Sequence, residues 1–168
     1  AYPSYPIGWA GNLTQVKGGH VIGANNPTED IFGEVWADGL TNNSGQGSHM
    51  IAQFGYKYVG STVYNSVYGS VYNSVYGVDS DNDFIWVNAE YVGDSGNNDK
   101  YKANFTPDKI GKWEYAMRFS DDQGQNWTMT DILSFNVVPS DDLVKPTAPV
   151  LNQPGIESSR VSLTWSPS

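Results

Sequence analysis

Large apolar side chains alternate with polar or small ones along Trp113-Glu114-Tyr115-Ala116-Met117-Arg118-Phe119. Successive residues of a β-strand point to opposite faces of a sheet, so this order places the three aromatic residues and Met117 on one face. The turn-forming sequence Asp121-Asp122-Gln123-Gly124 follows, and residues 127–129 are the expected returning arm. The stretch therefore predicts a β-hairpin whose large rings fill a core.

Comparable patterns on both sides of this hairpin predict further strands at 30–37, 49–56, 84–91, 100–106 and 132–138. In residues 84–91 the alternation puts Trp86 and Asn88 on one face, and Ile85 and Val87 on the other. No window long enough for a helix shows a 3.6-residue period. About seven strands separated by turn signals predict an all-β fold, an immunoglobulin- or fibronectin-like two-sheet β-sandwich with a long hairpin insertion.

Composition supports this fold and argues against several classes of function. The 168 residues include 11 Tyr, 6 Trp, 18 Gly and 9 Pro, residue types that favour strands and turns. A net charge of −9 with only 9 Lys and Arg argues against binding to nucleic acid or to anionic membranes. No apolar run approaches the roughly 20 residues that cross a membrane. The absence of cysteine excludes disulfides and thiolate metal sites.

The chain divides by composition into a module, a linker and a fragment. Residues 1–139 carry the strand patterns of the sandwich, and the proline-containing stretch 140–149 offers no apolar face to bury. Residues 150–168 hold two strand patterns without partners in this chain, as expected of a second domain that is truncated. The missing initiator Met and signal peptide are typical of a mature or excised fragment.

A low-complexity insertion at 62–78 repeats the sequence Val-Tyr-(Asn/Gly)-Ser. Its even period places all tyrosines on one face of an extended strand, and Gly69-Ser70 suits a tight turn at the centre of a hairpin. One interpretation is a tyrosine platform that stacks on sugars. The other is a duplication that lengthened a surface loop, which loops tolerate at little entropic cost.

No constellation of residues predicts catalysis. The histidines, His20 and His49, are far apart and match no nucleophile or zinc motif. Paired carboxylates would be needed to cleave a glycosidic bond, but Glu34, Glu90 and Glu114 lie in strand patterns that explain them as solvated surface residues. We therefore expect no enzymatic activity from this chain itself.

Acidic residues alternate at Asp79, Asp81 and Asp83, which makes calcium the one cofactor to consider. The match to an EF-hand loop fails because Phe84 occupies the sixth position, where the sharp turn requires glycine. A calcium site of another type remains one alternative, there or at 94–99. Ordinary turns are the other, because Asp and Asn hydrogen-bond their own backbone.

Tryptophans interleaved with polar side chains predict a carbohydrate-binding surface. The candidate residues are Trp36, Trp86, Trp127, Gln53 and Asn88, because sugar sites combine a stacking ring with polar side chains that hydrogen-bond hydroxyl groups. The alternative for each tryptophan is a place in the core, since few leucines are available to fill it.

Several blocks in this order resemble accessory β-sandwich modules of bacterial amylopullulanases and pullulanases. The blocks are Phe32-Gly33-Glu34-Val35-Trp36, Ile51-Ala52-Gln53-Phe54-Gly55-Tyr56, Trp86-Val87-Asn88-Ala89-Glu90-Tyr91, Gly96-Asn97-Asn98-Asp99-Lys100-Tyr101 and 111–119. The resemblance covers about residues 7–138, and the tail with Val161-Ser162-Leu163-Thr164-Trp165 resembles the start of a fibronectin type III domain.

The resemblance implies a non-catalytic module of a secreted, extracellular enzyme whose α-amylase-like catalytic barrel lies elsewhere in the polypeptide. The implied partners are α-glucans such as starch and pullulan, together with the neighbouring domains. The alternative is a structural spacer without a ligand.

Overall fold

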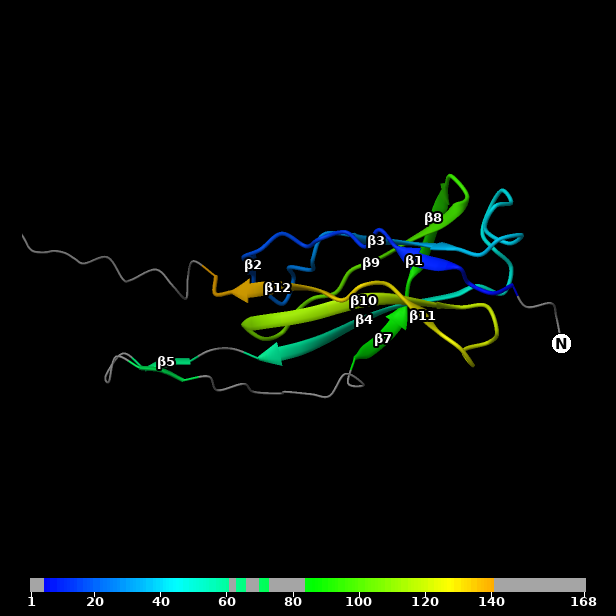
Figure 1. Cartoon of the computed structure of the whole chain (residues 1–168). Helices are drawn as coiled ribbons and strands as arrows, with labels where there is room; N and C mark the ends of the chain where they lie inside the picture. Colours follow the sequence, from blue (N-terminus) through cyan, green and yellow to red (C-terminus); the bar gives the residue numbers. More distant parts are fainter. Residues whose placement is uncertain (1–4, 61–62, 66–69, 73–83, 141–168) are drawn as a thin grey trace, which may run out of the picture. The chain divides into compact units, whose positions relative to one another are not determined.

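The computed structural model describes residues 5–60, 63–65, 70–72 and 84–140, which contain β-strands and no helix (Figure 1). One sheet has the order β1-β3-β9-β8, with β1 Trp9–Gly11, β3 Ile31–Trp36, β8 Glu90–Ser95 and β9 Asn98–Ala103. The second sheet has the order β2-β12-β10-β4-β7, and β11 also pairs with β10. Its strands are β2 His20–Val21, β4 Ile51–Gly60, β7 Ile85–Asn88, β10 Gly111–Ser120, β11 Thr128–Met129 and β12 Leu133–Val138. The predicted all-β, two-sheet sandwich is confirmed.

Strand β10 is central to the second sheet because it pairs with β4, β11 and β12. Its alternating large side chains face the first sheet: Trp113 is 4% exposed, and Tyr115, Met117 and Phe119 are fully buried. Across the core, a Cβ on Gly33 of β3 would lie 2.6 Å from the Met117 sulfur. A larger residue at this position would therefore require the Met117 side chain to move.

Tyr115 ties the N-terminal segment to the core through its hydroxyl group. The hydroxyl accepts a hydrogen bond from the backbone N–H of Val16 at 2.8 Å and donates one to the carbonyl of Thr14 at 2.7 Å. Both Tyr115 and Val16 are buried. These bonds fix the segment that follows β1 against the inner face of β10.

The stretch predicted as one strand over 84–91 is two strands in different sheets. β7 pairs with β4 in the second sheet, whereas β8 pairs with β9 in the first. The chain crosses between them at Ala89, whose N–H donates to the carbonyl of Ala52 at 2.9 Å. Ile85 therefore lies at an exposed sheet edge, with 56% of its surface accessible.

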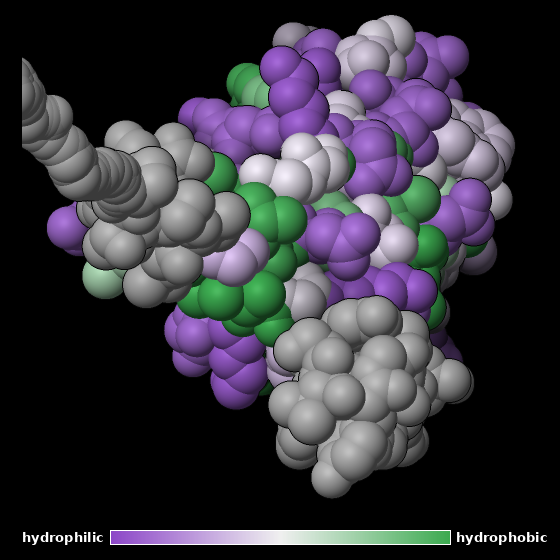
Figure 2. Space-filling view, turned by 90° about the vertical axis from the view of Figure 1, so that its left-hand side faces the viewer, coloured by the Kyte–Doolittle hydropathy of each residue, from purple (hydrophilic) through white to green (hydrophobic). Residues whose placement is uncertain are grey.

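Apolar surface also reaches solvent at the end of the sandwich formed by β2 and the start of β10. Val21 is 41% exposed and Ile110 is 39% exposed. Figure 2 views the molecule from this end and shows hydrophobic residues gathered among hydrophilic ones.

In the insertion, β5 (Val63–Asn65) pairs with β6 (Ser70–Tyr72) as a separate two-stranded sheet. Ser70 is the first residue of β6, and Gly69, the other residue of the predicted turn, lies outside the described residues. The chain divides into two units, Ala1–Val138 and Pro139–Ser168. Most of the predicted linker and all of the predicted fibronectin type III fragment lie outside the described residues and stay predictions.

We expect Tyr115→Phe to lower the free energy of unfolding by about 1–3 kcal/mol, because it leaves the buried N–H of Val16 without an acceptor. Chemical denaturation measures the effect. Tyr58→Phe is the matched control, since it removes a single bond, from the Tyr58 hydroxyl to the exposed carbonyl of Ile110. Equal losses in the two variants would contradict this account of the N-terminal segment.

Candidate functional site

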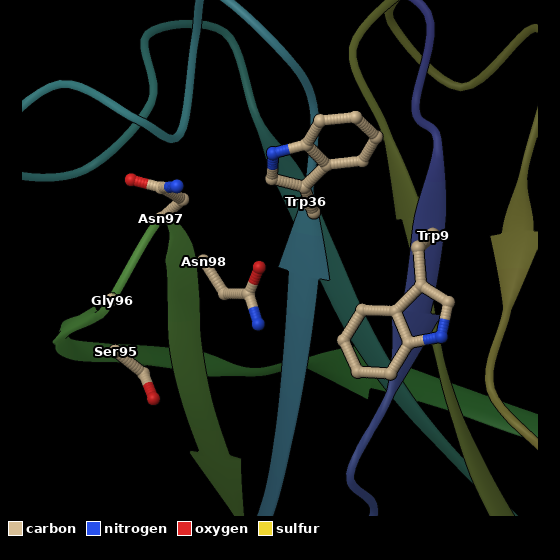
Figure 3. A pocket seen from close by; sticks show the side chains of 6 residues that line it. All are labelled: Trp9, Trp36, Ser95, Gly96, Asn97 and Asn98. Atoms are coloured by element: carbon tan, nitrogen blue, oxygen red, sulfur yellow. The ribbon is translucent and has the colours of Figure 1, made fainter.

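Two tryptophans lie side by side on the outer face of the first sheet. Trp9 of β1 is directly opposite Trp36 of β3 in the antiparallel pair. They line an open hollow together with the β8–β9 turn, from which Ser95, Gly96, Asn97 and Asn98 contribute (Figure 3). Trp9 is 39% exposed and Trp36 is half-buried. We call Trp9, Trp36 and this turn the tryptophan platform.

Each ring of the platform rests against a glycine of the N-terminal segment. A Cβ on Gly8 would lie 2.3 Å from the Trp36 ring, and one on Gly11 would lie 2.4 Å from the Trp9 ring. Side chains at these positions would displace the rings. The glycines thus hold the rings close to the backbone and leave ring surface open to solvent. Trp36 was predicted as a site residue, whereas Trp9 was missed; its place between two glycines is the signal that marks it.

The turn that completes the platform is a tight hairpin. Ser95 pairs with Asn98, so Gly96 and Asn97 form a two-residue loop, and Gly96 has a φ of 61°. Glycine at the first loop position is the preference of the hairpin turns that match strand twist. The buried hydroxyl of Thr41 donates to the carbonyl of Asn97 at 2.8 Å and thereby holds the turn against the 38–49 loop.

Glu34 lies beneath the platform and is 9% exposed, so its prediction as a solvated residue is wrong. Its Oε1 accepts hydrogen bonds from Asn12 Nδ2 at 3.1 Å and Asn98 Nδ2 at 3.0 Å. Its Oε2 accepts from the Ser95 hydroxyl at 3.2 Å. Alternation along β3 gives the correct face for Glu34 but cannot show that polar residues from β8, β9 and the N-terminal segment cover it.

A second carboxylate supports the same hairpin from inside. Asp99 is fully buried; its Oδ2 accepts from the N–H of Gly47 at 2.7 Å, and its Oδ1 has no hydrogen-bond partner among the described residues. Asp94 is its cross-strand neighbour and accepts from the N–H of Gly45 and the hydroxyl of Tyr91. Burial, together with the charge of Asp94, raises the pKa of Asp99 from 3.8 to about 6.

A raised pKa means that the folded module holds this proton more tightly than the unfolded chain does. The resulting stabilisation is fully present below about pH 4 and is lost as the pH rises through about 6. We expect Asp99→Asn to flatten the dependence of unfolding free energy on pH across this window. Denaturation curves at several pH values test it, with the exposed Asp131→Asn as the control. Parallel profiles for wild type and Asp99→Asn would contradict the prediction.

The other predicted site residues lie on the outer face of the second sheet. Arg118 of β10 is stacked between two tryptophans, with its guanidinium carbon 4.0 Å from the ring centroids of both Trp86 and Trp127. Its Nε donates to Gln53 Oε1 at 2.9 Å, and Gln53 pairs across the strands with Asn88. The structure therefore brings these four predicted residues together around Arg118, apart from Trp36.

In this second group, the tryptophan ring faces contact other side chains of the protein. Trp86 stacks with Arg118, and the Phe84 ring also stacks against Trp86, with ring centroids 5.4 Å apart. The Nζ atom of Lys57 lies 5.3 Å from the centroid of the Phe84 ring and extends this row of stacked side chains. Beside Trp127, a Cβ on Gly124 would lie 3.3 Å from the ring. Cation–π stacks of this kind stabilise a sheet surface and occupy ring face that a ligand would otherwise contact.

The remaining predicted site lies outside the described residues, because Asp79, Asp81 and Asp83 fall in the range 73–83. Within the described ranges, no group of three or more His, Asp or Glu is placed to hold a metal ion. Glu90 is exposed, and Glu114 lies 3.9 Å from Lys57. In the same described part, no helix is long and apolar enough to cross a membrane.

The whole chain is similar to a segment of three curated amylopullulanases. The identity is 76% over 168 residues for the protein of Thermoanaerobacterium thermosulfurigenes, 74% over 170 for that of Thermoanaerobacterium saccharolyticum and 61% over 176 for that of Thermoanaerobacter thermohydrosulfuricus. The chain spans 9%, 13% and 12% of their lengths, respectively. The predicted resemblance is confirmed: the chain corresponds to a small accessory module within such polypeptides.

No family model matches the chain. Among solved structures, the CARDB domain of the PF1109 protein of Pyrococcus furiosus, in complex with di-metal ions, aligns with 83% of this chain and 99% of its own at 13% identity. Its TM-score of 0.33 is too low to carry an argument about fold or ligand.

Proposed function

We propose that this module binds α-glucan on the tryptophan platform and belongs to a secreted enzyme that degrades starch or pullulan. The observation that carries the proposal is the cross-strand pair Trp9 and Trp36, whose rings rest over Gly11 and Gly8 and line an open hollow beside polar side chains. Aromatic rings with a few oriented polar groups are the usual composition of sites for small polar ligands. The parent polypeptide would supply the glycoside hydrolase activity, as the similarity to amylopullulanases suggests.

A weak site of this kind acts by tethering. Once the module holds one part of a glucan, neighbouring glycosidic bonds reach the catalytic domain at a raised effective concentration. The net charge of −9 suits an extracellular surface, since it keeps the protein soluble and gives no affinity for anionic membranes. The ligand is therefore expected to be neutral, and contacts with the rings, rather than ion pairs, should dominate its binding.

Affinity electrophoresis in gels containing pullulan, amylopectin or dextran tests the proposal. We expect pullulan and amylopectin to retard the module and dextran to leave its mobility unchanged. Trp36→Ala and Trp9→Ala should each abolish the retardation, and denaturation curves show whether each variant stays folded. Unchanged mobility of the wild type in all three gels would favour a spacer without a ligand.

The Arg118 stack supplies the matched comparison, because Trp86 is also a tryptophan but lies on the second sheet. Trp86→Ala removes the contacts with Arg118 and Phe84 and is expected to lower the free energy of unfolding by about 1–3 kcal/mol while retardation persists. Thermal or chemical denaturation gives the stability. Loss of retardation in Trp86→Ala, with stability intact, would instead place the glucan on the second sheet.

A further inference from the structure

We propose that Glu34 is a positioning residue that fixes the hydrogen-bonding polarity of the tryptophan platform, so that the site selects neutral, hydroxyl-rich glycans and rejects anionic ones. This inference rests on the proposed function and adds a residue that determines which ligands the platform accepts. Glu34 is buried beneath the platform and holds side chains from two strands and the N-terminal segment.

The polarity follows from what a carboxylate can accept. A carboxylate has no hydrogen to donate, so each of its partners must donate to it. Asn98 therefore directs Nδ2 towards Glu34 and turns Oδ1 away from it. Figure 3 shows this oxygen on the side of Trp36. The Ser95 hydroxyl donates its one hydrogen to Glu34 Oε2, so its oxygen can only accept further hydrogen bonds.

The two side chains that Glu34 orients thus present acceptor oxygens at the platform. A sugar hydroxyl can donate to such an oxygen, whereas a carboxylate or sulfate cannot. An anionic group would also lie close to the charge of Glu34, in a chain with a net charge of −9.

Two lysines lie on the outer face of β9, and Lys100 is the cross-strand partner of Glu34. Lys100 Nζ lies 4.7 Å from the Phe32 ring centroid, and Lys102 Nζ lies 3.6 Å from Asp30. Both cations are therefore held by partners on the sheet face rather than directed to the platform.

Calorimetric titration at pH 7 tests the inference with two probes of equal length, maltoheptaose and maltoheptaose oxidised to carboxylates at C6. We expect the wild type to bind the neutral probe at least about tenfold more tightly. Glu34→Gln places an N–H₂ group among donors, so Asn98 loses its fixed orientation. The affinity for the neutral probe should then fall by about fivefold or more, and the ratio between the affinities for the two probes should become smaller.

Glu90→Gln is the matched control, because it makes the same change of charge at an exposed position of β8 in the same sheet. It should leave both affinities unchanged. Ser95→Ala removes one of the three hydrogen bonds to Glu34 at a half-buried position. Like Glu34→Gln, it should lower the affinity for the neutral probe. Ser95→Ala keeps the test valid if Glu34→Gln does not fold.

The outcomes separate this inference from the proposed function. Loss of maltoheptaose binding in Trp36→Ala, together with full affinity and discrimination in Glu34→Gln, would overturn the inference and leave the proposed function intact. If the wild type binds neither probe, the proposed function fails, and the specificity inferred for Glu34 fails with it. The orientation itself is tested without ligand by the side-chain amide resonances of Asn98. Glu34→Gln should shift them and Glu90→Gln should not; an unchanged spectrum would overturn the inference.

Discussion

The hydroxyl of Tyr115 is the contact on which the arrangement of the platform depends. It bonds the backbone at Thr14 and Val16 from the middle of β10, and so fixes the segment that leads out of β1. β1 in turn carries Trp9 opposite Trp36 and supplies the glycine against which the Trp9 ring rests. A polar group inside an aromatic core thus determines the position of rings on the outside of the other sheet. The cost of burying it is offset because both of its hydrogen bonds are made.

The two sheets use tryptophan in different ways, and the difference lies in what covers the ring. On the second sheet, Arg118 and Phe84 contact Trp86, so its ring becomes part of the protein surface. On the first sheet, Trp36 and Trp9 rest over glycines, as Trp86 does over Gly55, but they line an open hollow. Residue type alone does not separate these roles, because all of these tryptophans lie in or beside short strands.

Sequence patterns predicted what depends on neighbours along the chain and missed what depends on pairing between strands. The alternation over 113–119 was sufficient to place the core face of β10, because that strand stays within one sheet. The crossing at Ala89 left the alternation unbroken, so 84–91 looked like a single strand. The burial of Glu34 depends on Asn12 and Asn98, which are distant in sequence, and no local pattern reports them.

The crossing at Ala89 also has a mechanical consequence. A force on the β8–β9 turn, such as the proposed glucan ligand would exert, would pass along β8 and through Ala89 directly into β7. The load then runs parallel to β7 and acts on its whole register with β4, from Gln53–Asn88 to Tyr56–Ile85, at the same time. Bonds loaded together in shear resist more force than bonds opened one after another. The register between β7 and β4 is therefore the part of the second sheet that would bear such a load.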